Sequence, residues 1–428
     1  MPPSSTLSYY RATATPYAAH APLEGSHDVR VAIVGGGYAG LNTALGLAER
    51  GVRDVLLLER EQVGFGASGR NGGFVFGGYS LGEQALLDQL GPARARAIFG
   101  LTTAAVERIR HRVAQYAIAC DAIEQGVIWA NWFRDPDVLR KRQQLLAEHF
   151  GTAWDWLPQE ELRERVLSTR YYDGLHERNA LHLHPLNYAI GLGTAAAGLG
   201  VRLHEHSAVT GLVREGARWR LRTARGDVLA DQVVLACGGY LAGLQRRIDR
   251  AILPIATYVM VTEPLGERMA ECMQTRAAVY DSRFAFDYYR PLPDTRLLWG
   301  GRISVRNRSP AAVQRLLTHD LLRVFPQLRG VRVDYAWSGL MSYARHQMPQ
   351  IGGGDGLWWA QAFGGHGLAP TCAAGELLAA AIAEGDGGWR QFADYGLAST
   401  HRPLGYLGAQ ASYWWQQGQD WLKTRLEG

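Results

Sequence analysis

The stretch VAIVGGGYAGLNTALGLAERGVRDVLLLE, residues 31–59, decides the fold of this chain. It begins with a short apolar run rich in β-branched residues, which is typical of a buried parallel strand. Glycines follow at positions 35, 37 and 40 in the spacing G-x-G-x-x-G, and a helix is expected from about Tyr38 to Glu49. A second apolar strand, residues 55–58, ends at Glu59. The pattern predicts a β-α-β unit that binds a dinucleotide.

Each part of this unit has a physical role. Gly35 allows a sharp turn, Gly37 lets the backbone approach a pyrophosphate, and Gly40 lets the helix pack closely on the strand. The helix points its free N–H groups and its positive dipole end at the phosphates. Glu59, nineteen positions after Gly40, is placed to accept hydrogen bonds from a ribose. This stretch alone leaves FAD and NAD open.

The composition is that of a globular enzyme. The 428 residues are enough for two or three structural units. The net charge of +5 and the scattered arginines argue against nucleic-acid binding. The four cysteines are far apart, which disfavours a zinc site or a disulfide framework and favours a cytoplasmic location. No apolar run is long enough to span a membrane, and residues 1–27 lack a signal-peptide core and are expected to form an extended arm.

Two further glycine-rich elements lie far from the first. Residues 62–80, QVGFGASGRNGGFVFGGYS, contain Ser68, Arg70 and Asn71, which offer a hydroxyl, a positive charge and an amide to phosphates. The alternative for this segment is a mobile surface loop. Residues 357–385 predict a strand, a glycine turn at FGGHGLAP and a helix whose start is suited to negative charge.

The other segments alternate between helical and strand-rich blocks. Residues 81–147 carry apolar residues at helical spacing, with a break at Gly91-Pro92. Residues 252–333 contain three candidate antiparallel strands and an amphipathic helix that begins near Ser309. The tail contains SYWWQQGQDWLKTRL, with an aromatic stripe of Tyr413, Trp414 and Trp421. We favour packing of this stripe on the chain's own surface, and the alternative is peripheral contact with a membrane.

The three glycine elements together resemble the glycine oxidase/D-amino-acid oxidase superfamily of FAD enzymes. The segments HPLNYAIG, VTEPLG, FDYYR, FPQL and DYAWSG also recur at matching spacings and are similar to the gamma-glutamylputrescine oxidase-like branch. The resemblance covers roughly residues 28–385 and favours FAD over NAD.

The resemblance implies an α/β fold with two domains. The first is a Rossmann-like FAD-binding domain of the glutathione-reductase type, discontinuous in sequence. The second is an α+β substrate domain built on a mixed or antiparallel sheet. The expected division is residues 1–27 for the arm, 28–85, 175–245 and 339–385 for the FAD-binding domain, 86–174 and 246–338 for the substrate domain, and 386–428 for a helical tail.

The resemblance also implies which residues bind FAD. The first glycine turn and Glu59 hold the ADP half, the second glycine element lines the pyrophosphate and ring, and the third meets the pyrimidine edge of the flavin. Because GLMSYARHQMPQ contains no cysteine, noncovalent FAD is expected. The expected cofactor residues are Gly35, Gly37, Tyr38, Ala39, Gly40, Glu59, Arg60, Ala67, Ser68, Arg70, Asn71, Gly72, Gly73, Val209, Cys237, Gly238, Gly365, His366, Gly367 and Leu368.

The implied reaction is oxidation of a C–N bond. A hydride passes from carbon to flavin N5, and the imine product is hydrolysed. The substrate is an amine or amino acid, such as gamma-glutamylputrescine or L-pipecolate, and the electron acceptor is oxygen, a quinone or a protein. A noncatalytic flavin-binding subunit or sensor of a heteromeric oxidase is the alternative, and an NAD-dependent dehydrogenase is disfavoured.

Six residues are candidates for the catalytic side of the site. Arg302 is expected to bind a substrate carboxylate, since an arginine fork pairs with two oxygens. His346 is expected to orient the amine or act as a base, with a structural histidine as the alternative. Tyr258 and Tyr289 are candidate pocket walls, as are Tyr288 and Trp337, and core packing is the alternative for each of them. No metal site is expected.

Overall fold

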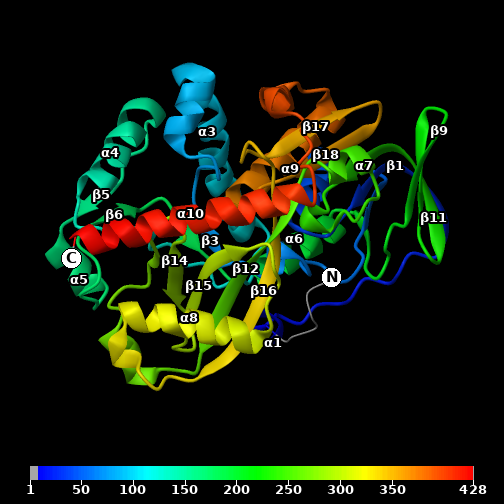
Figure 1. Ribbon diagram of the computed structural model, residues 1–428. Coiled ribbons are helices and arrows are strands. Elements are labelled where there is room, and N and C mark those ends of the chain that lie inside the picture. Colours follow the sequence, from blue (N-terminus) through cyan, green and yellow to red (C-terminus); the bar gives the residue numbers. More distant parts are fainter. Residues whose placement is uncertain (1–7, 428) are drawn as a thin grey trace.

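The computed structural model describes residues 8–427, which contain two large β-sheets (Figure 1). The first sheet is mainly parallel, with β1 between β2 and β11. In spatial order it contains β17 (Gln350–Gly354), β18 (Leu357–Gln361), β11 (Gly226–Leu235), β1 (Gly25–Val34), β2 (Val55–Leu58) and β8 (Arg202–His204), and β10 (Arg218–Arg222) joins β9 (Gly211–Glu215) to β11. Segments from three separate parts of the chain therefore build one sheet, as expected for an FAD-binding domain that is discontinuous in sequence. Because β1 begins at Gly25, the predicted arm ends before residue 25 rather than at residue 27, and its first seven residues lie outside the described part of the chain.

Four helices pack with this sheet into one core. They are α2 (Tyr38–Glu49), α3 (Glu83–Gln115), α6 (Pro185–Gly198) and α9 (Leu368–Glu384). Helix α2 has the expected bounds, and α3 is kinked at Gly91, where φ is +73°. The division expected from the sequence places most of α3 in the substrate domain. Its buried side chains, including Ile98 and Ile109, instead pack in the core around α2 and α9. Its apolar face therefore belongs with the nucleotide-binding unit.

The second sheet is mixed and mostly antiparallel. In order it contains β16 (Val333–Tyr343), β12 (Leu253–Thr262), β15 (Leu297–Ser304), β14 (Asp287–Pro291), β13 (Ala278–Asp281), β4 (Val127–Ala130), β6 (Gly174–Glu177) and β5 (Asp155–Leu157). Helix α8 (Pro310–Val324) packs on one side of it and is capped by the Ser309 hydroxyl, as predicted. Strands β6 and β16 pair in this sheet, so the expected boundaries at residues 175 and 339 fall inside strands of the substrate unit.

The remaining elements are short, apart from the last helix. They are α1 (Tyr9–Ala12), β3 (Phe74–Val75) paired with β7 (Leu181–His182), α4 (Asp137–Leu145), α5 (Gln159–Arg165), α7 (Arg246–Asp249) and α10 (Leu404–Glu427). Helix α10 runs across the front of the molecule in Figure 1. Among residues 8–427, no helix has the length and apolar character that a bilayer crossing requires.

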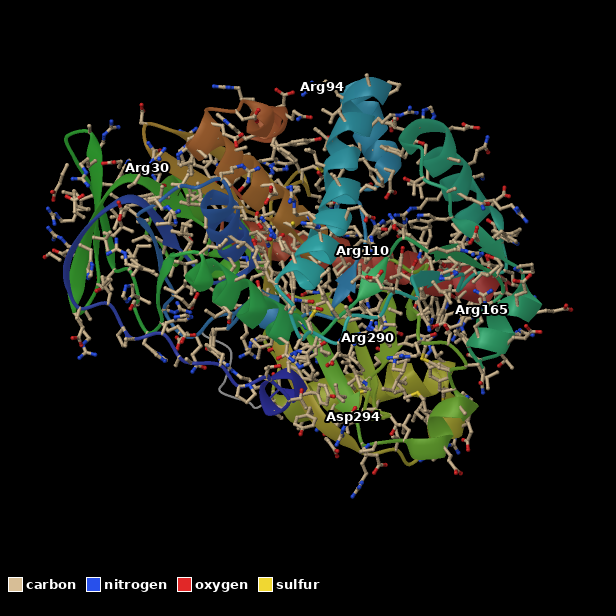
Figure 2. The ribbon with its side chains drawn as sticks, turned by 180° about the vertical axis from the view of Figure 1, so that it is seen from behind. Arg30, Arg94, Arg110, Arg165, Arg290 and Asp294 are labelled. Atoms are coloured by element: carbon tan, nitrogen blue, oxygen red, sulfur yellow. The ribbon has the colours of Figure 1, made fainter. Side chains whose placement is uncertain are left out.

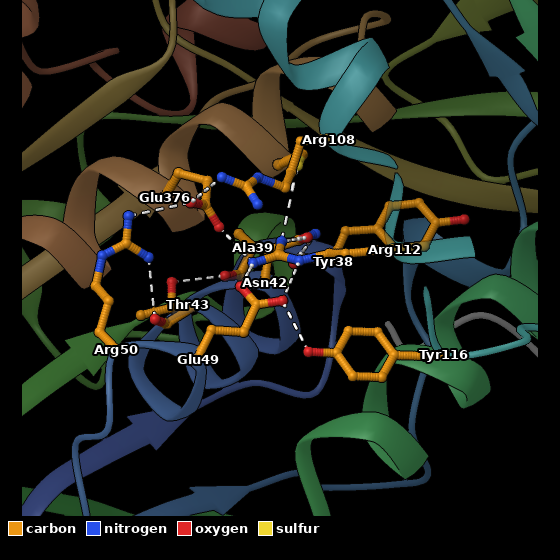
Figure 3. Close-up of polar contacts among 12 residues, drawn as sticks. Tyr38, Ala39, Asn42, Thr43, Glu49, Arg50, Arg108, Arg112, Tyr116 and Glu376 are labelled. Atoms are coloured by element: carbon orange, nitrogen blue, oxygen red, sulfur yellow. Dashed lines mark hydrogen bonds and ion pairs between the residues drawn. The ribbon is translucent and has the colours of Figure 1, made fainter. Parts of the chain in front are cut away.

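A buried arginine ties the helices of the first unit together (Figure 3). The Arg112 guanidinium of α3 donates to Glu49 of α2 at 2.5 Å, to Asn42 of α2 at 2.7 Å, and to Glu376 of α9. Its side chain is completely buried, and the carboxylates of Glu49 and Glu376 supply its counter-charge. The hydroxyl of Tyr116 adds a hydrogen bond to Glu49 at 3.1 Å.

A second buried arginine joins the second large sheet to the segments beside β3 and β7 (Figure 2). Arg290 of β14 donates to the backbone carbonyls of Gly72 at 2.7 Å and Leu183 at 2.9 Å. It also lies 3.3 Å from His182, whose other ring nitrogen bonds to a backbone carbonyl. His184 accepts the N–H of Asn187 and so caps α6. Both histidines therefore have structural roles. Arg290 fixes the second glycine element to the substrate sheet.

Candidate active site

A cleft of about 1260 Å³ lies between the two units. It is bordered by the carboxyl ends of β1 and β2, the first turns of α2 and α9, and residues of the second sheet. This volume exceeds the usual range for one drug-sized ligand, so the cleft has room for a dinucleotide and a substrate. Eighteen of the twenty expected cofactor residues border it. The other two, Gly40 and Gly73, lie behind its wall, where they allow close backbone packing.

The first glycine turn has the tight backbone geometry that its spacing predicts. Gly35 has φ of +113°, and a Cβ there would lie 2.6 Å from the Ala236 carbonyl oxygen. A Cβ on Gly40 would lie only 2.0 Å from the Gly35 carbonyl oxygen. Gly37 gives α2 no side-chain cap, which leaves the start of the helix available to an anion. The Ser68 hydroxyl accepts the N–H of Tyr38 at 2.9 Å and brings the second glycine element to the same point.

Glu59 lies at the end of β2, on the border of the cleft. Its carboxylate accepts the N–H groups of Gly36 at 2.7 Å and Glu61 at 2.9 Å. Burial raises the pKa of Glu59, and these two N–H groups act in the opposite direction by stabilising the charge. The bonds fix the carboxylate at the position where the ribose of a dinucleotide is expected.

The second glycine element is a wall of the cleft with its own hydrogen bonds. The Asn71 side chain donates to the carbonyls of Ala67 and Ser68 at 3.0 and 2.9 Å and accepts the N–H of Gly73 at 2.8 Å. Arg70 is buried and donates to the Phe65 carbonyl at 2.9 Å. This geometry disagrees with the alternative of a mobile surface loop.

The third glycine element brings a second helix start to the cleft. Helix α9 begins at Leu368, and Gly367 supplies no side-chain cap. Burial lowers the pKa of His366 to about 4, so the ring is neutral at pH 7. The ring packs edge-on against Phe76, with centroids 5.2 Å apart. The free helix start therefore supplies the positive end of a dipole without a charged side chain.

An aromatic wall that could not be identified from the sequence alone borders the cleft, and its Phe76 ring contacts His366 beside this helix start. Trp129 of β4 and Tyr280 of β13 are register partners and stack at 5.8 Å, and Phe76 stacks on Tyr280 at 5.7 Å. The Arg142 guanidinium lies 4.3 Å from the Trp129 ring and pairs with Glu83 at 2.7 Å. All but Glu83 border the cleft. Strand β4 lies in the alternating segment QGVIWANW, and the residue that Trp129 faces in its partner strand, Tyr280, is 151 positions further along the chain.

Two of the predicted catalytic residues point away from the cleft. Tyr258 lies in the core beside α8, and its hydroxyl donates to the Arg306 carbonyl at 2.6 Å. Tyr289 stacks on Trp299 at 4.5 Å in the same core. Successive side chains of a strand point to opposite faces, so the neighbours Thr257 and Tyr288 border the cleft instead. The prediction of Tyr258 and Tyr289 as pocket walls is wrong for this reason.

The structure also contradicts the roles expected for Arg302 and His346. Arg302 is the extra residue of a β-bulge opposite Thr257 and Tyr258 and has φ of +59°. Although it borders the cleft, its guanidinium donates to the fully buried Asp320 at 2.8 and 2.6 Å, so it is no free carboxylate anchor. The His346 ring packs on Tyr395 with centroids 5.1 Å apart, outside the cleft. It therefore has the structural role that was its alternative.

The residues along the cleft are suited to binding FAD for two structural reasons. Glycine occupies the positions where a Cβ would collide with backbone, and two helices whose N-cap residue is glycine begin at the border of the same cleft. An NAD-dependent dehydrogenase has no use for the second helix start, so fold and cleft define a flavin-dependent oxidoreductase. The chain belongs to the family of FAD dependent oxidoreductases, whose model matches residues 30–381.

Relatives agree with this assignment. The chain is 37% identical over 377 residues to gamma-glutamylputrescine oxidoreductase of Escherichia coli, covering 87% of this chain and 88% of the relative. Its fold is similar to that of glycine oxidase from Geobacillus kaustophilus, with a TM-score of 0.71, 24% identity, and coverage of 87% and 99%. L-proline dehydrogenase from P. horikoshii also has a TM-score of 0.71, at 18% identity and coverage of 88% and 100%. The family uses FAD, and so does this chain.

Acid precipitation is expected to release the flavin from the protein. Of the two cysteines near the cleft, Cys372 is fully buried in the core, and burial raises the pKa of Cys237 to about 12, which keeps its thiol protonated and unreactive. The measurement is the flavin absorbance of the supernatant and of the washed pellet after trichloroacetic acid treatment. A yellow pellet that stays yellow on unfolding in denaturant contradicts noncovalent binding.

Proposed function

We propose that this protein oxidises the C–N bond of an amine. The observation that carries the proposal is the aromatic wall of Trp129, Tyr280 and Phe76, which borders the same cleft as the start of α9. Aromatic faces attract the partly positive groups around an amine nitrogen and exclude water. Bound FAD supplies the hydride acceptor for this chemistry.

The chain's own residues bind and orient the substrate. The wall favours an alkylamine that lies flat against it, and the neutral His366 does not repel a protonated amine on arrival. The Arg142 guanidinium lies beside Trp129 of the wall, where it borders the cleft and offers hydrogen-bond donors to a polar substrate tail, while Glu83 holds it from outside the cleft. The start of α9 stabilises negative charge that develops on the acceptor.

Three of the six arginines that border the cleft, those of α4, the β13–β14 loop and β15, are paired with acids and so support an amine rather than an α-amino acid. Arg142 pairs with Glu83, Arg302 pairs with Asp320, and Arg283 pairs with Asp281. A carboxylate next to the reacting carbon would compete with these acids for a guanidinium. A long amine such as gamma-glutamylputrescine, the substrate named for the 37% identical relative, is therefore the first candidate.

Anaerobic addition of gamma-glutamylputrescine is expected to bleach the flavin, and L-pipecolate, L-proline, sarcosine and D-amino acids are expected to act more slowly. In Tyr280→Ala the bleaching rate should fall about tenfold, because one face of the amine site is lost. Tyr289→Phe is the matched control and should not change the rate, since Tyr289 lies on the α8 side. If no amine bleaches the wild type, the noncatalytic subunit becomes the better interpretation.

The electron acceptor and compartment are further parts of the proposal. Oxygen or a quinone can reoxidise a flavin, and comparing peroxide release with dye reduction under air distinguishes an oxidase from a dehydrogenase. All four cysteines are free thiols, which supports a reducing compartment such as the cytoplasm.

A further inference from the structure

One face of helix α10 packs on the rest of the protein and forms hydrogen bonds with it. Tyr413 accepts the N–H of Ile303 at 3.1 Å, Asp420 accepts the N–H of Phe284 at 2.9 Å, and Thr424 accepts the indole N–H of Trp132 at 3.2 Å. Gln410 and Tyr413 also border the cleft. These contacts, spread along its length, hold the helix flat on the surface, as Figure 1 shows.

The opposite face of α10 is apolar and uncovered. Of the thirteen exposed positions on the helix, Arg425 is the only one with a charge. Seven of the eleven exposed large hydrophobic side chains among residues 8–427 belong to it, with Trp414 at 66% and Trp415 at 69% exposure. The α10 outer face consists of Leu404, Leu407, Trp414, Trp415, Trp421, Leu422 and Leu426.

The exposure of this face contradicts the expectation that the aromatic stripe of the tail packs on the chain's own surface. Of the three residues in the predicted stripe, Tyr413 packs inward, but Trp414 and Trp421 point outward. A large apolar patch on a soluble protein marks a contact surface. Phe284 and Phe286, in the loop beside the helix, are exposed as well and extend the patch toward the cleft.

Four arginines lie at or near the C-terminal end of the helix, beside Lys423, which is paired with Asp135 and Glu427. Arg425 lies on the helix, and the backbone N–H of Arg134 donates to Glu427 at 2.8 Å. Arg170 and Arg323 stack on Trp132, at 3.6 and 4.9 Å from its ring. Within the described part of the chain, none of these four arginines forms an ion pair.

We propose that the α10 outer face docks on an anionic phospholipid surface. Tryptophan and leucine on one face of a helix that lies flat, with arginines at its end, are the features of interfacial membrane binding. Charge complementarity selects lipid over a second copy of this chain. The outer face exposes no acidic residue, so a second copy would leave the arginines without partners, whereas phospholipid headgroups provide them.

The test is cosedimentation of the holoenzyme with vesicles. Binding is expected to vesicles of phosphatidylcholine with one-quarter phosphatidylglycerol at low salt, and it should be much weaker with phosphatidylcholine alone. The triple variant Trp414→Ser, Trp415→Ser, Trp421→Ser should bind at least tenfold more weakly. Arg425→Gln should bind about fivefold more weakly, the effect of one charge near such a surface.

Matched variants separate this effect from general changes of the surface. Val213→Ser removes an exposed apolar side chain from β9, and Arg30→Gln removes an exposed charge from β1, and neither should change binding. Flavin content and light scattering show whether each variant is folded and monomeric. Wild-type protein that stays in the supernatant overturns the proposal. So does a wild-type dimer that the triple variant converts to a monomer, because the face then binds a second copy.

Discussion

Gly40→Ala is expected to yield a protein that no longer retains FAD. The new Cβ would lie 2.0 Å from the Gly35 carbonyl oxygen and 3.3 Å from Ile33. The backbone of the turn cannot shift to make room for the new Cβ. Gly35 lies close to the backbone of Ala236, and its N–H donates to the Leu58 carbonyl at 2.8 Å. Helix α2 must therefore move away from β1, and its first turn no longer faces the phosphates. We expect at least a roughly hundredfold weaker affinity for FAD, with about 1–3 kcal/mol of lost stability from overpacking.

The measurement is the ratio of flavin to protein absorbance after purification, followed by titration of the apoprotein with FAD. Gly198→Ala is the matched control, since a Cβ at that helical position meets nothing within 4 Å. It should keep its flavin and be slightly more stable, because alanine restricts the unfolded chain. Full flavin content in Gly40→Ala would contradict the role of this turn.

Arg112→Ala is expected to destabilise the protein by about 3–5 kcal/mol, the cost of removing one partner from a buried ion pair. The substitution leaves Glu49 and Glu376 facing each other between α2, α3 and α9, with side chains only 17% and 19% exposed (Figure 3). Glu49 then lacks its ion-pair partner, and Glu376 keeps only the half-exposed Arg108 and the partly exposed Arg50. Equilibrium denaturation in urea, followed by circular dichroism and by flavin release, measures the effect.

The matched control is Arg94→Ala. Arg94 pairs with Asp394 at 2.6 Å, but the two side chains are 53% and 64% exposed, so water screens the pair. Its loss should cost between about 0 and 1 kcal/mol. Equal effects of the two substitutions would mean that the Arg112 network is not what holds the three helices together.

The nucleotide-binding half of this protein could be predicted from short segments. The bounds of α2, the strand before Glu59, the cap at Ser309 and the kink at Gly91 all depend on residues within a few positions of one another. Resemblance then linked the three glycine elements. The structure places them around one cleft, because β18, β11, β1 and β2 follow one another in one sheet and the three elements come after β1, β2 and β18.

The substrate half could not be predicted in the same way. A shift of one residue in a strand exchanges its two faces, and the pattern around Tyr288 and Tyr289 is aromatic on both. The bulge at Arg302 turns a strand residue toward α8, and no local signal marks it. The pairing of β4 with β13 depends on the whole sheet, so the wall of Trp129 and Tyr280 was not visible.

The sequence by itself determined that this chain holds a dinucleotide, because glycine spacing, helix start and terminal acid are local and act through the backbone. Only the tertiary structure decided which side chains face the substrate and that Trp414 and Trp421 face outward. The physical reason is that the environment of a side chain depends on sheet register and on helix orientation. Both are set by contacts between segments far apart in the chain.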